Sequence, residues 1–213
     1  MLFQGRSRPV IGLDITTSSI KLIELSRSGD GYRVESYAAE PSPPNAINEK
    51  AIVDSQAVGE AVRRAVKRAG ARSKDCAVAI SGDAAITKVI QMPRNLREGE
   101  LESQVEMQAD QYIPFPMEEV SFDFEVIGPS EKDPEMLDVL LVATRSENVE
   151  QRQAAVQAAG LLTRIVDVEA FALENACRLL THQMPDGGMD RNIAVVDFGA
   201  SSTTFSVLRD LKV

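Results

Sequence analysis

The chain has 213 residues, of which 44% are hydrophobic and 26% are charged, which is typical of a globular protein with room for one large domain or two modest ones. Its formal net charge of -9 argues against nonspecific binding to nucleic acid and against direct binding to anionic lipid, because both attract Lys and Arg. The single histidine and the two distant cysteines, Cys76 and Cys177, argue against a zinc site and a disulfide framework.

Residues 1–8 are expected to be either a remnant of expression or a disordered N-terminus, and they are set aside from the prediction of the fold. Leu2-Phe3-Gln4-Gly5 is typical of the remnant of a protease site left by recombinant expression. No apolar run approaches the ~20 residues of a membrane-spanning helix, and the N-terminus lacks the apolar segment of a signal peptide. We therefore expect a cytoplasmic protein that does not insert directly into a membrane.

Strands and helices are predicted to alternate along the chain, as in an α/β fold. Apolar or alternating runs predict strands over residues 10–15, 20–25, 32–40, 75–81, 85–92, 120–127, 136–144, 161–166, 193–197 and 203–208. Apolar residues at helical spacing predict helices over 55–70, 98–113, 147–160 and 170–180. Short turns join the first three strands, which predicts an antiparallel meander.

The most informative feature is a design that occurs near both ends of the chain. Residues 12–21 and 195–204 each contain an apolar strand, an Asp at its end, a turn of small residues and a returning strand. One such hairpin could be no more than a hairpin with a polar turn. Two copies, separated by mixed α/β sequence, are what a two-lobed nucleotide clamp needs, with one phosphate hairpin in each lobe.

The residue types in both turns suit a polyphosphate and its cation. Small residues let backbone N–H groups approach phosphate oxygens, and hydroxyl groups add further donors. The predicted phosphate cradle comprises Thr16, Thr17, Ser18, Ser19, Gly199, Ala200, Ser201, Ser202 and Thr203. Asp14 and Asp197 are predicted to hold a hydrated Mg²⁺ through water, and Lys21 to supply a point charge. The alternatives are Asp residues that cap their own turns and a solvated strand lysine.

With these motifs, the chain resembles the superfamily of actin, sugar kinases and seventy-kilodalton chaperones. Residues 14–21 match its first phosphate motif and 197–203 its second, while 83–166 resembles the extra subdomain of the cell-division protein FtsA. The sequence also resembles the PilM family of type IV pilus assembly proteins. Its most specific match is Gln108-Ala109-Asp110-Gln111-Tyr112-Ile113-Pro114-Phe115-Pro116, a segment that nucleotide binding does not require.

The resemblance implies an α/β protein with an actin-like, ribonuclease H-like fold. It implies a first subdomain over 9–82 and 167–191, an inserted FtsA-like subdomain over 83–166, and the start of a second lobe over 192–213. In the family the second lobe continues further, so we expect a chain truncated after the second phosphate hairpin, without the adenosine-binding residues. The full-length parent is expected to bind ATP and Mg²⁺, and this chain weakly or not at all.

For function, the resemblance implies a cytoplasmic ATP-binding scaffold at the inner membrane. It would bind the cytoplasmic tail of a PilN-type membrane protein and contact other pilus assembly proteins. A groove between the first subdomain and the insertion would suit an extended peptide, with Tyr112, Ile113 and Phe115 near its rim. The alternative for these three residues is a helix stop packed on the core. Apolar strands at 193–196 and 205–208 also predict self-association.

One acidic residue is a candidate for a role in catalysis. Glu169 lies where the superfamily often places the residue that orients the attacking water, although Glu174 or a helix-capping role fits similarly. A sugar kinase or other phosphotransferase would need a general-base Asp and sugar-binding polar residues, for which the sequence offers no convincing candidate. An FtsA-like cell-division role would need a C-terminal amphipathic membrane helix. We expect at most a weak ATPase and not a metabolic enzyme.

Overall fold

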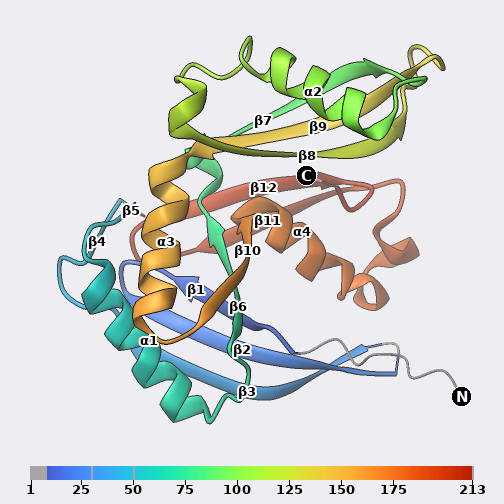
Figure 1. The fold of residues 1–213 in the computed structure, drawn as a ribbon. Coiled ribbons are helices and arrows are strands. Elements are labelled where there is room, and N and C mark those ends of the chain that lie inside the picture. Colours follow the sequence, from blue (N-terminus) through green and yellow to red (C-terminus); the bar gives the residue numbers. More distant parts are fainter. Residues whose placement is uncertain (1–8, 30, 50, 213) are drawn as a thin grey trace, which may run out of the picture. The chain divides into compact units, whose positions relative to one another are not determined.

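The computed structural model describes residues 9–29, 31–49 and 51–212 (Figure 1). Residues 1–8, expected to be either a remnant of expression or a disordered N-terminus, lie outside the described residues. The chain divides into two compact units. The first unit comprises Met1–Ser81 and Glu150–Val213, and the second unit comprises Gly82–Val149.

In the described part of the chain, the first unit is built on a five-stranded sheet with the order β10-β6-β1-β2-β3. These strands are β1 (Ile11–Ile15), β2 (Ser19–Ser28), β3 (Gly31–Pro41), β6 (Asp75–Ile80) and β10 (Leu162–Val168). The first three form the predicted antiparallel meander, whereas β6 runs parallel to β1 and β10 runs parallel to β6. This combination is the sheet of the predicted actin-like, ribonuclease H-like fold.

Helices and short elements complete the first unit. They are β4 (Ile47–Asn48), β5 (Ala51–Ile52), α1 (Ser55–Ala69), the part of α3 (Ser146–Ala158) from Glu150 onward, α4 (Glu169–Arg178), and the 3-10 turns Thr181–Gln183 and Pro185–Gly188. The strands β11 (Asn192–Phe198) and β12 (Thr203–Arg209) pair with each other as a separate sheet.

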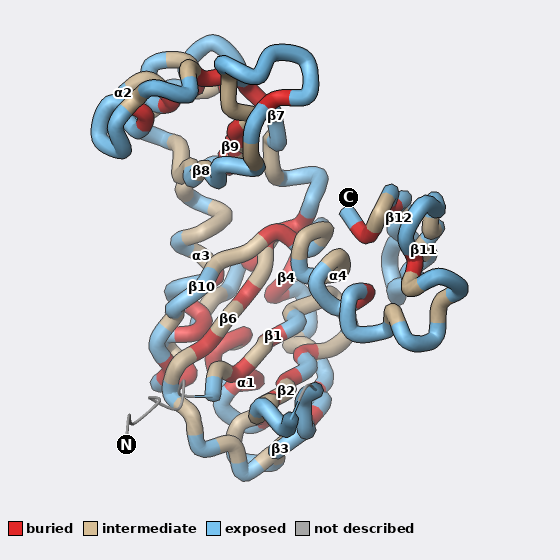
Figure 2. Tube along the Cα trace, turned by 90° about the vertical axis from the view of Figure 1, so that its right-hand side faces the viewer, coloured by how far each residue is buried: buried red, intermediate tan, exposed pale blue. Residues whose placement is uncertain are grey.

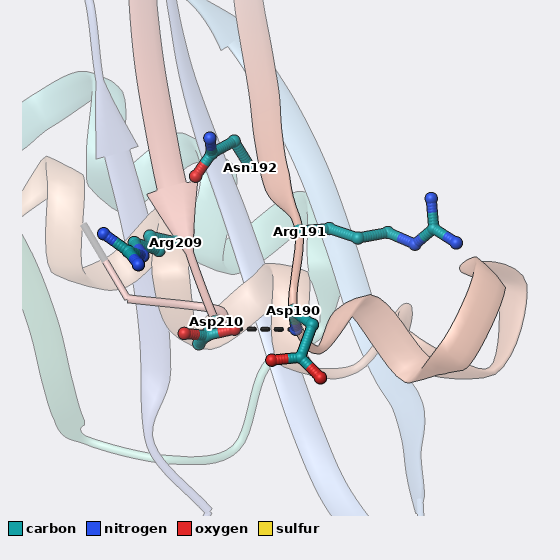
Figure 3. Close-up of a pocket in the computed structure, with 5 residues that line it drawn as sticks. All are labelled: Asp190, Arg191, Asn192, Arg209 and Asp210. Carbon is teal, nitrogen blue, oxygen red and sulfur yellow. Dashed lines mark hydrogen bonds between the residues drawn. The ribbon is translucent and has the colours of Figure 1, made fainter.

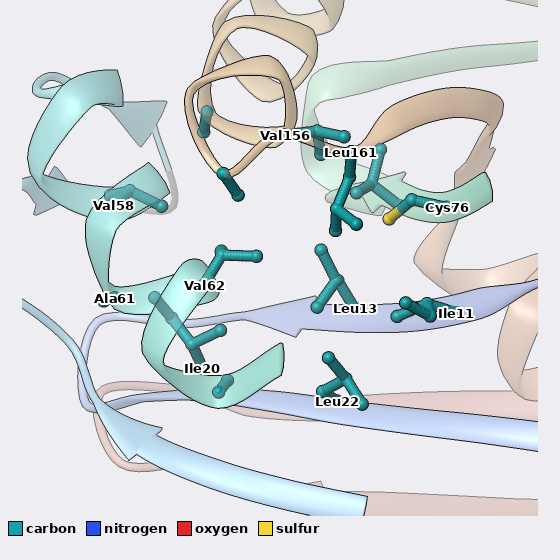
Figure 4. Close-up of a cluster of buried hydrophobic side chains, with 14 of the residues drawn as sticks. Ile11, Leu13, Ile20, Leu22, Val58, Ala61, Val62, Cys76, Val156 and Leu161 are labelled. Carbon is teal, nitrogen blue, oxygen red and sulfur yellow. The ribbon is translucent and has the colours of Figure 1, made fainter. Parts of the chain in front are cut away.

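Helix α1 has the ends and the buried face that its sequence predicts. At its start, Asp54 Oδ1 accepts a hydrogen bond of 2.9 Å from the Ala57 amide, which satisfies one of the free donors of the first turn. At its end, Gly70 takes up the left-handed conformation with φ 65°, which favours glycine. Its buried residues are Val58, Gly59, Ala61, Val62 and Ala65. Of these, Val58, Ala61, Val62 and Ala65 join apolar side chains of β1, β2, β6 and α3 in one core (Figure 4).

Gly59 allows α1 and α3 to approach closely. A Cβ atom at this position would lie 2.5 Å from Ala158 Cβ and 2.7 Å from the carbonyl oxygen of Ala155. Such distances are far shorter than ordinary van der Waals contacts, so a larger residue would force the helices apart. The Arg63 guanidinium reinforces the crossing by donating to the carbonyl oxygen of Ala158.

The second unit packs a helix on a sheet. Within its described residues the sheet has the order β7-β9-β8, with every neighbouring pair antiparallel. Its elements are β7 (Ala85–Pro93), α2 (Glu98–Ala109), β8 (Val120–Pro129), β9 (Met136–Arg145) and the 3-10 turns Gly82–Ala84 and Met117–Glu119. Its core includes Ile90, Met92, Leu101, Val105, Val139 and Leu141. Buried positions of this unit lie on α2, β7 and β9 (Figure 2).

The inserted unit ends earlier than the sequence predicted. We expected it to cover residues 83–166, but the compact unit is Gly82–Val149. Ala155 and Val156 of α3 belong to the core of the first unit, and β10 pairs with β6 in the first unit's sheet. The predicted boundary was wrong because an apolar strand looks the same in sequence whichever sheet provides its partner. The hairpin of β11 and β12, predicted as the start of a second lobe, groups with the first unit here.

Candidate functional site

The two repeated hairpins share one hydrogen-bonded register. Asp14 pairs with Lys21 across β1 and β2, and Asp197 pairs with Thr204 across β11 and β12. In both hairpins the Asp and its partner are seven positions apart in the chain. Each turn holds four residues and is closed by an amide of its first residue, which donates to the carbonyl oxygen of its fourth. The bonds are Thr16 to Ser19 at 3.0 Å and Gly199 to Ser202 at 2.9 Å. The predicted repetition is confirmed in the backbone.

The first turn lacks glycine, and side chains stabilise it instead. Thr16 Oγ1 donates to the Ser19 carbonyl oxygen at 2.8 Å and accepts from the Ser19 amide at 3.2 Å. Ser42, directly after β3, donates from its amide to the Ser18 carbonyl oxygen at 3.1 Å and from Oγ to the Thr16 carbonyl oxygen at 2.6 Å. The sequence analysis did not single out Ser42. A hydroxyl residue between prolines, at the end of a neighbouring strand, was the available signal.

The second turn depends on glycine at the position that corresponds to Thr16. A Cβ atom on Gly199 would lie 2.8 Å from the Ser202 carbonyl oxygen, which is the acceptor of the bond that closes the turn. The same four-residue turn is therefore stabilised in two ways, by a threonine hydroxyl in one copy and by the absence of a side chain in the other.

Both turns offer hydrogen-bond donors for an anion. Across the described ranges, the amides of Thr17, Ser18, Ala200 and Ser201 donate to no protein acceptor. Ser18, Ala200 and Ser201 are exposed, and Thr17 is half-buried. Unpaired amides beside small hydroxyl side chains can bind phosphate oxygens, so these residues fit a polyphosphate.

The structure brings the two turns together. Thr17 Oγ1 and Ser201 Oγ lie 3.0 Å apart, within hydrogen-bonding distance. Lys21 Nζ donates to Asp14 Oδ2 at 2.7 Å. That hydrogen bond raises the pKa of Lys21, burial lowers it, and the charges of Asp14 and Asp197 raise it further. The predicted cation ligands of both hairpins thus act on the same lysine.

This arrangement suits a cation that carries its own water. Asp14 and Asp197 contribute carboxylates, and no group of three or more His, Cys, Asp or Glu side chains suited to a metal ion occurs among the described residues. Two carboxylates are too few to enclose a bare Mg²⁺, but they can hold its bound water while phosphates complete the coordination. The Lys21 ammonium is an alternative counter-charge for both carboxylates when no cation is bound.

Glu169 begins α4 directly after β10, at the end of the sheet. The preceding residue, Val168, pairs with Ile80 of β6. Beside them, the Arg152 side chain is buried and its Nε donates to the Ala79 carbonyl oxygen at 2.7 Å. Burial lowers the pKa of Arg152, and the charge of Glu169 opposes this shift. The sequence analysis did not single out Arg152, because an arginine within a helix is usually solvated. The predicted role of Glu169 in orienting water stays a prediction.

The predicted aromatic rim is part of the packing of the second unit. Ile113 is 5% exposed and belongs to the unit's core, against which Phe115 also packs. The Arg145 guanidinium lies 4.2 Å from the centre of the Phe115 ring. For Ile113 and Phe115 the structure supports the alternative of a helix stop packed on the core. Tyr112 keeps an exposed ring, with Lys88 Nζ 5.5 Å from its centre.

The sheet of the second unit has an outer face, opposite the core, that combines apolar and acidic residues. Paired residues of neighbouring strands lie on the same face. Thr87, Val142 and Asp123 form one row across this face, and Val89, Leu140 and Glu125 form the next. Val89 is 51% exposed, and Asp123 and Glu125 are exposed. An apolar strip therefore lies on β7 and β9, with a carboxylate edge on β8.

A polar hollow of about 340 Å³ lies at the open end of the second hairpin, away from its turn (Figure 3). It is lined by Asp190, Arg191, Asn192, Arg209 and Asp210. Asp210 Oδ1 accepts a hydrogen bond of 2.7 Å from the Asp190 amide. Because Asn192 pairs with Arg209 at the far end of the hairpin from Gly199, this hollow is separate from the candidate phosphate site.

None of the helices in the described residues is both long enough and apolar enough to span a membrane.

A family model described as type IV pilus assembly protein PilM matches residues 12–213. The chain belongs to the PilM family. A solved structure titled as the PilM-PilN type IV pilus biogenesis complex matches with a TM-score of 0.78 and 31% identity, over 97% of this chain and 60% of that chain. The chain thus spans less than two thirds of that PilM structure.

Two further solved structures show weaker similarity. One is the cytoplasmic domain of EpsL, an inner membrane component of the type II secretion system of Vibrio cholerae, with a TM-score of 0.48 and 14% identity over 75% of this chain and 57% of that chain. The other is a Bacteroides thetaiotaomicron protein with an actin-like ATPase fold and unknown function, with a TM-score of 0.44 and 8% identity over 100% of this chain and 70% of that chain. The PilM match and the sheet order confirm the predicted actin-like α/β fold.

Proposed function

We propose that the chain belongs to a cytoplasmic, nucleotide-responsive scaffold of type IV pilus assembly, which binds a PilN-type membrane protein. The observation that carries this proposal is the convergence of the two matched hairpins on Lys21, in a chain of the PilM family. A nucleotide would give a scaffold two states, and a partner with a membrane segment would hold it at the inner membrane.

The nucleotide would be held through its phosphates. The free amides of Thr17, Ser18, Ala200 and Ser201 and the neighbouring hydroxyls would donate to phosphate oxygens. Asp14 and Asp197 would hold Mg²⁺ through its water, and the cation would neutralise phosphate charge. Lys21 would then exchange its bond with Asp14 for a phosphate oxygen, because the cation replaces the ammonium as the counter-charge of that carboxylate.

The partner would contact the outer face of the second unit's sheet. The matched solved structure is a complex of PilM with PilN, which supports a PilN-type partner for this chain. The strip of Val89, Leu140 and Val142 can accept apolar side chains, and Asp123 and Glu125 can attract Lys or Arg. An extended tail with alternating apolar and basic residues has the chemistry that fits this face.

Substitution of the two aspartates tests the nucleotide part of the proposal. We expect Asp14→Asn and Asp197→Asn in the full-length parent protein each to weaken Mg-ATP binding roughly tenfold or more, a loss of about 1.4 kcal/mol, in isothermal titration calorimetry. Asp190→Asn is the matched control, because Asp190 lies next to the same hairpin but at its opposite end. Unchanged affinity in both site variants would refute the assignment.

A further inference from the structure

We propose that Arg152 is a positioning residue, which ties Glu169 at the end of the first unit's sheet to the two segments where the chain enters and leaves the inserted second unit. The inference rests on the proposed function in one respect, because a nucleotide bound at the two hairpins would be what changes the position of Glu169. The link between Glu169 and the two segments is argued from the contacts of Arg152 alone.

The chain passes between the units at two places, after Ser81 and after Val149. Ala79 lies just before the first passage and Arg152 just after the second. The 2.7 Å bond from Arg152 Nε to the Ala79 carbonyl oxygen therefore joins the two connecting segments inside the first unit. A change in the position of Arg152 would strain this bond and would therefore affect both connecting segments.

Glu169 is attached to the same place by the sheet. Asp167 and Val168 of β10 pair with Ala79 and Ile80 of β6, and α4 begins at the next residue. The sheet therefore places the start of α4, with Glu169, beside the end of β6 that Arg152 contacts. A displacement of α4 would move this carboxylate relative to the guanidinium.

Burial makes the pair sensitive to such a displacement. Arg152 is 5% exposed, and a buried guanidinium is costly unless it is paired. The charge of Glu169 stabilises the charged form of Arg152 against its burial. Removing that charge takes away one of the groups that stabilise the buried guanidinium, so its bond to Ala79 should open more often. A carboxylate that shifts with the nucleotide state would act in the same way.

Hydrogen exchange of the 213-residue chain tests the connection without any nucleotide. We expect Glu169→Gln to accelerate amide exchange at residues 79–84 and 148–153 roughly fivefold or more, the lower end of typical coupling between sites. Glu150→Gln is the control, because Glu150 is exposed at the same connection and, two positions from Arg152 on a helix, does not face it. Arg152→Lys, which keeps the charge but loses the planar guanidinium, should accelerate the same peptides.

Exchange in Glu169→Gln that matches the control at both segments would overturn the inference. Acceleration spread evenly over the first unit would also overturn it, because that pattern reports general destabilisation. In the full-length parent, Mg-ATP should slow exchange at these segments in the wild type but not in Arg152→Lys, and equal slowing in both would count against the inference. If Mg-ATP does not bind the parent at all, the proposed function fails, whereas the Glu169→Gln result still decides the connection.

Discussion

The hydroxyl oxygens of Thr17 and Ser201 lie 3.0 Å apart, although the residues are 184 positions apart in the chain. Each belongs to the turn of one of the two repeated hairpins. A phosphate group close to this pair would be within reach of donors from both turns. If the two turns bind phosphate as proposed, each copy of the motif would supply half of the binding surface, which would explain why the motif occurs twice in the chain.

Lys21→Met should have little effect on the stability of the chain but a large effect on its site. The Lys21–Asp14 ion pair is about half exposed, so its loss should change the free energy of unfolding by no more than about 1 kcal/mol. The pKa of Lys21 is raised in the folded state, so any stabilisation is present below its ordinary value of 10.5 and is lost as pH rises through the folded pKa. The difference in unfolding free energy between wild type and variant, measured with urea, should therefore be smaller at pH 11 than at pH 8.

In the full-length parent, the same variant should lose Mg-ATP affinity because the phosphates lose a point charge. Lys67→Met, at an exposed position of α1, removes a lysine away from the hairpins and serves as the control. Equal affinities of the Lys21 and Lys67 variants would show that Lys21 is a solvated strand lysine, the alternative that the sequence left open.

Gly199→Ala should perturb the second hairpin locally. The added Cβ would lie 2.8 Å from the Ser202 carbonyl oxygen, so the turn must shift and its closing bond must lengthen. We expect faster amide exchange across residues 192–209, with the far-UV circular dichroism of the chain nearly unchanged. Gly99→Ala is the control, because no atom lies within 4 Å of a Cβ there. Normal exchange in the Gly199 variant would mean that the turn adapts without cost.

Gly59→Ala should destabilise the first unit. Alanine favours a helix by roughly 0.5–1 kcal/mol over glycine, but overpacking typically costs about 1–3 kcal/mol. The new Cβ would lie 2.5 Å from Ala158 Cβ, so we expect overpacking to dominate and the midpoint of urea unfolding to fall. Gly99→Ala in α2 meets open space and should leave stability unchanged or raise it. A Gly59 variant as stable as the wild type would show that the helices can separate easily.

The sequence predicted features that depend on local pattern. Alternating residues and small-residue turns predicted the repeated hairpins, whose register the structure reproduces. The prediction from sequence failed where the strand that a segment pairs with decides which unit the segment belongs to. The strand Leu162–Val168 is equally apolar in either unit, so only its pairing with β6 assigns it to the first sheet.

The site was predicted in part for the same reason. Asp14, Lys21 and Asp197 could be found from their positions within a repeated motif. Ser42 and Arg152 act through contacts with residues distant in sequence, Thr16 and Ala79, and no spacing rule connects them. Ile113 was placed at a surface because an apolar residue before a proline can either end a helix in the core or remain exposed.

The last prediction concerns the surface proposed to contact the partner. On the outer face of the second unit's sheet, Asp123 and Glu125 lie on β8, which is an edge strand in the described sheet order. An extended tail could pair with this edge through its main chain and present Lys or Arg to the carboxylates. Reversing both charges with Asp123→Lys and Glu125→Lys should therefore weaken a PilN-type tail peptide roughly tenfold or more and reduce the salt dependence of binding.

The measurement is fluorescence anisotropy of a labelled tail peptide with the full-length parent protein at two salt concentrations. Glu118→Lys with Glu119→Lys is the matched control, since both are exposed acidic residues of the same unit and the change in net charge is equal. Tyr112→Ala tests the predicted aromatic rim, because Tyr112 keeps an exposed ring. If Tyr112→Ala abolishes binding and the reversal on β8 does not, the tail binds at the rim and the outer face is not its site. Equal losses in the β8 variant and its control would show that only the net charge of the unit matters.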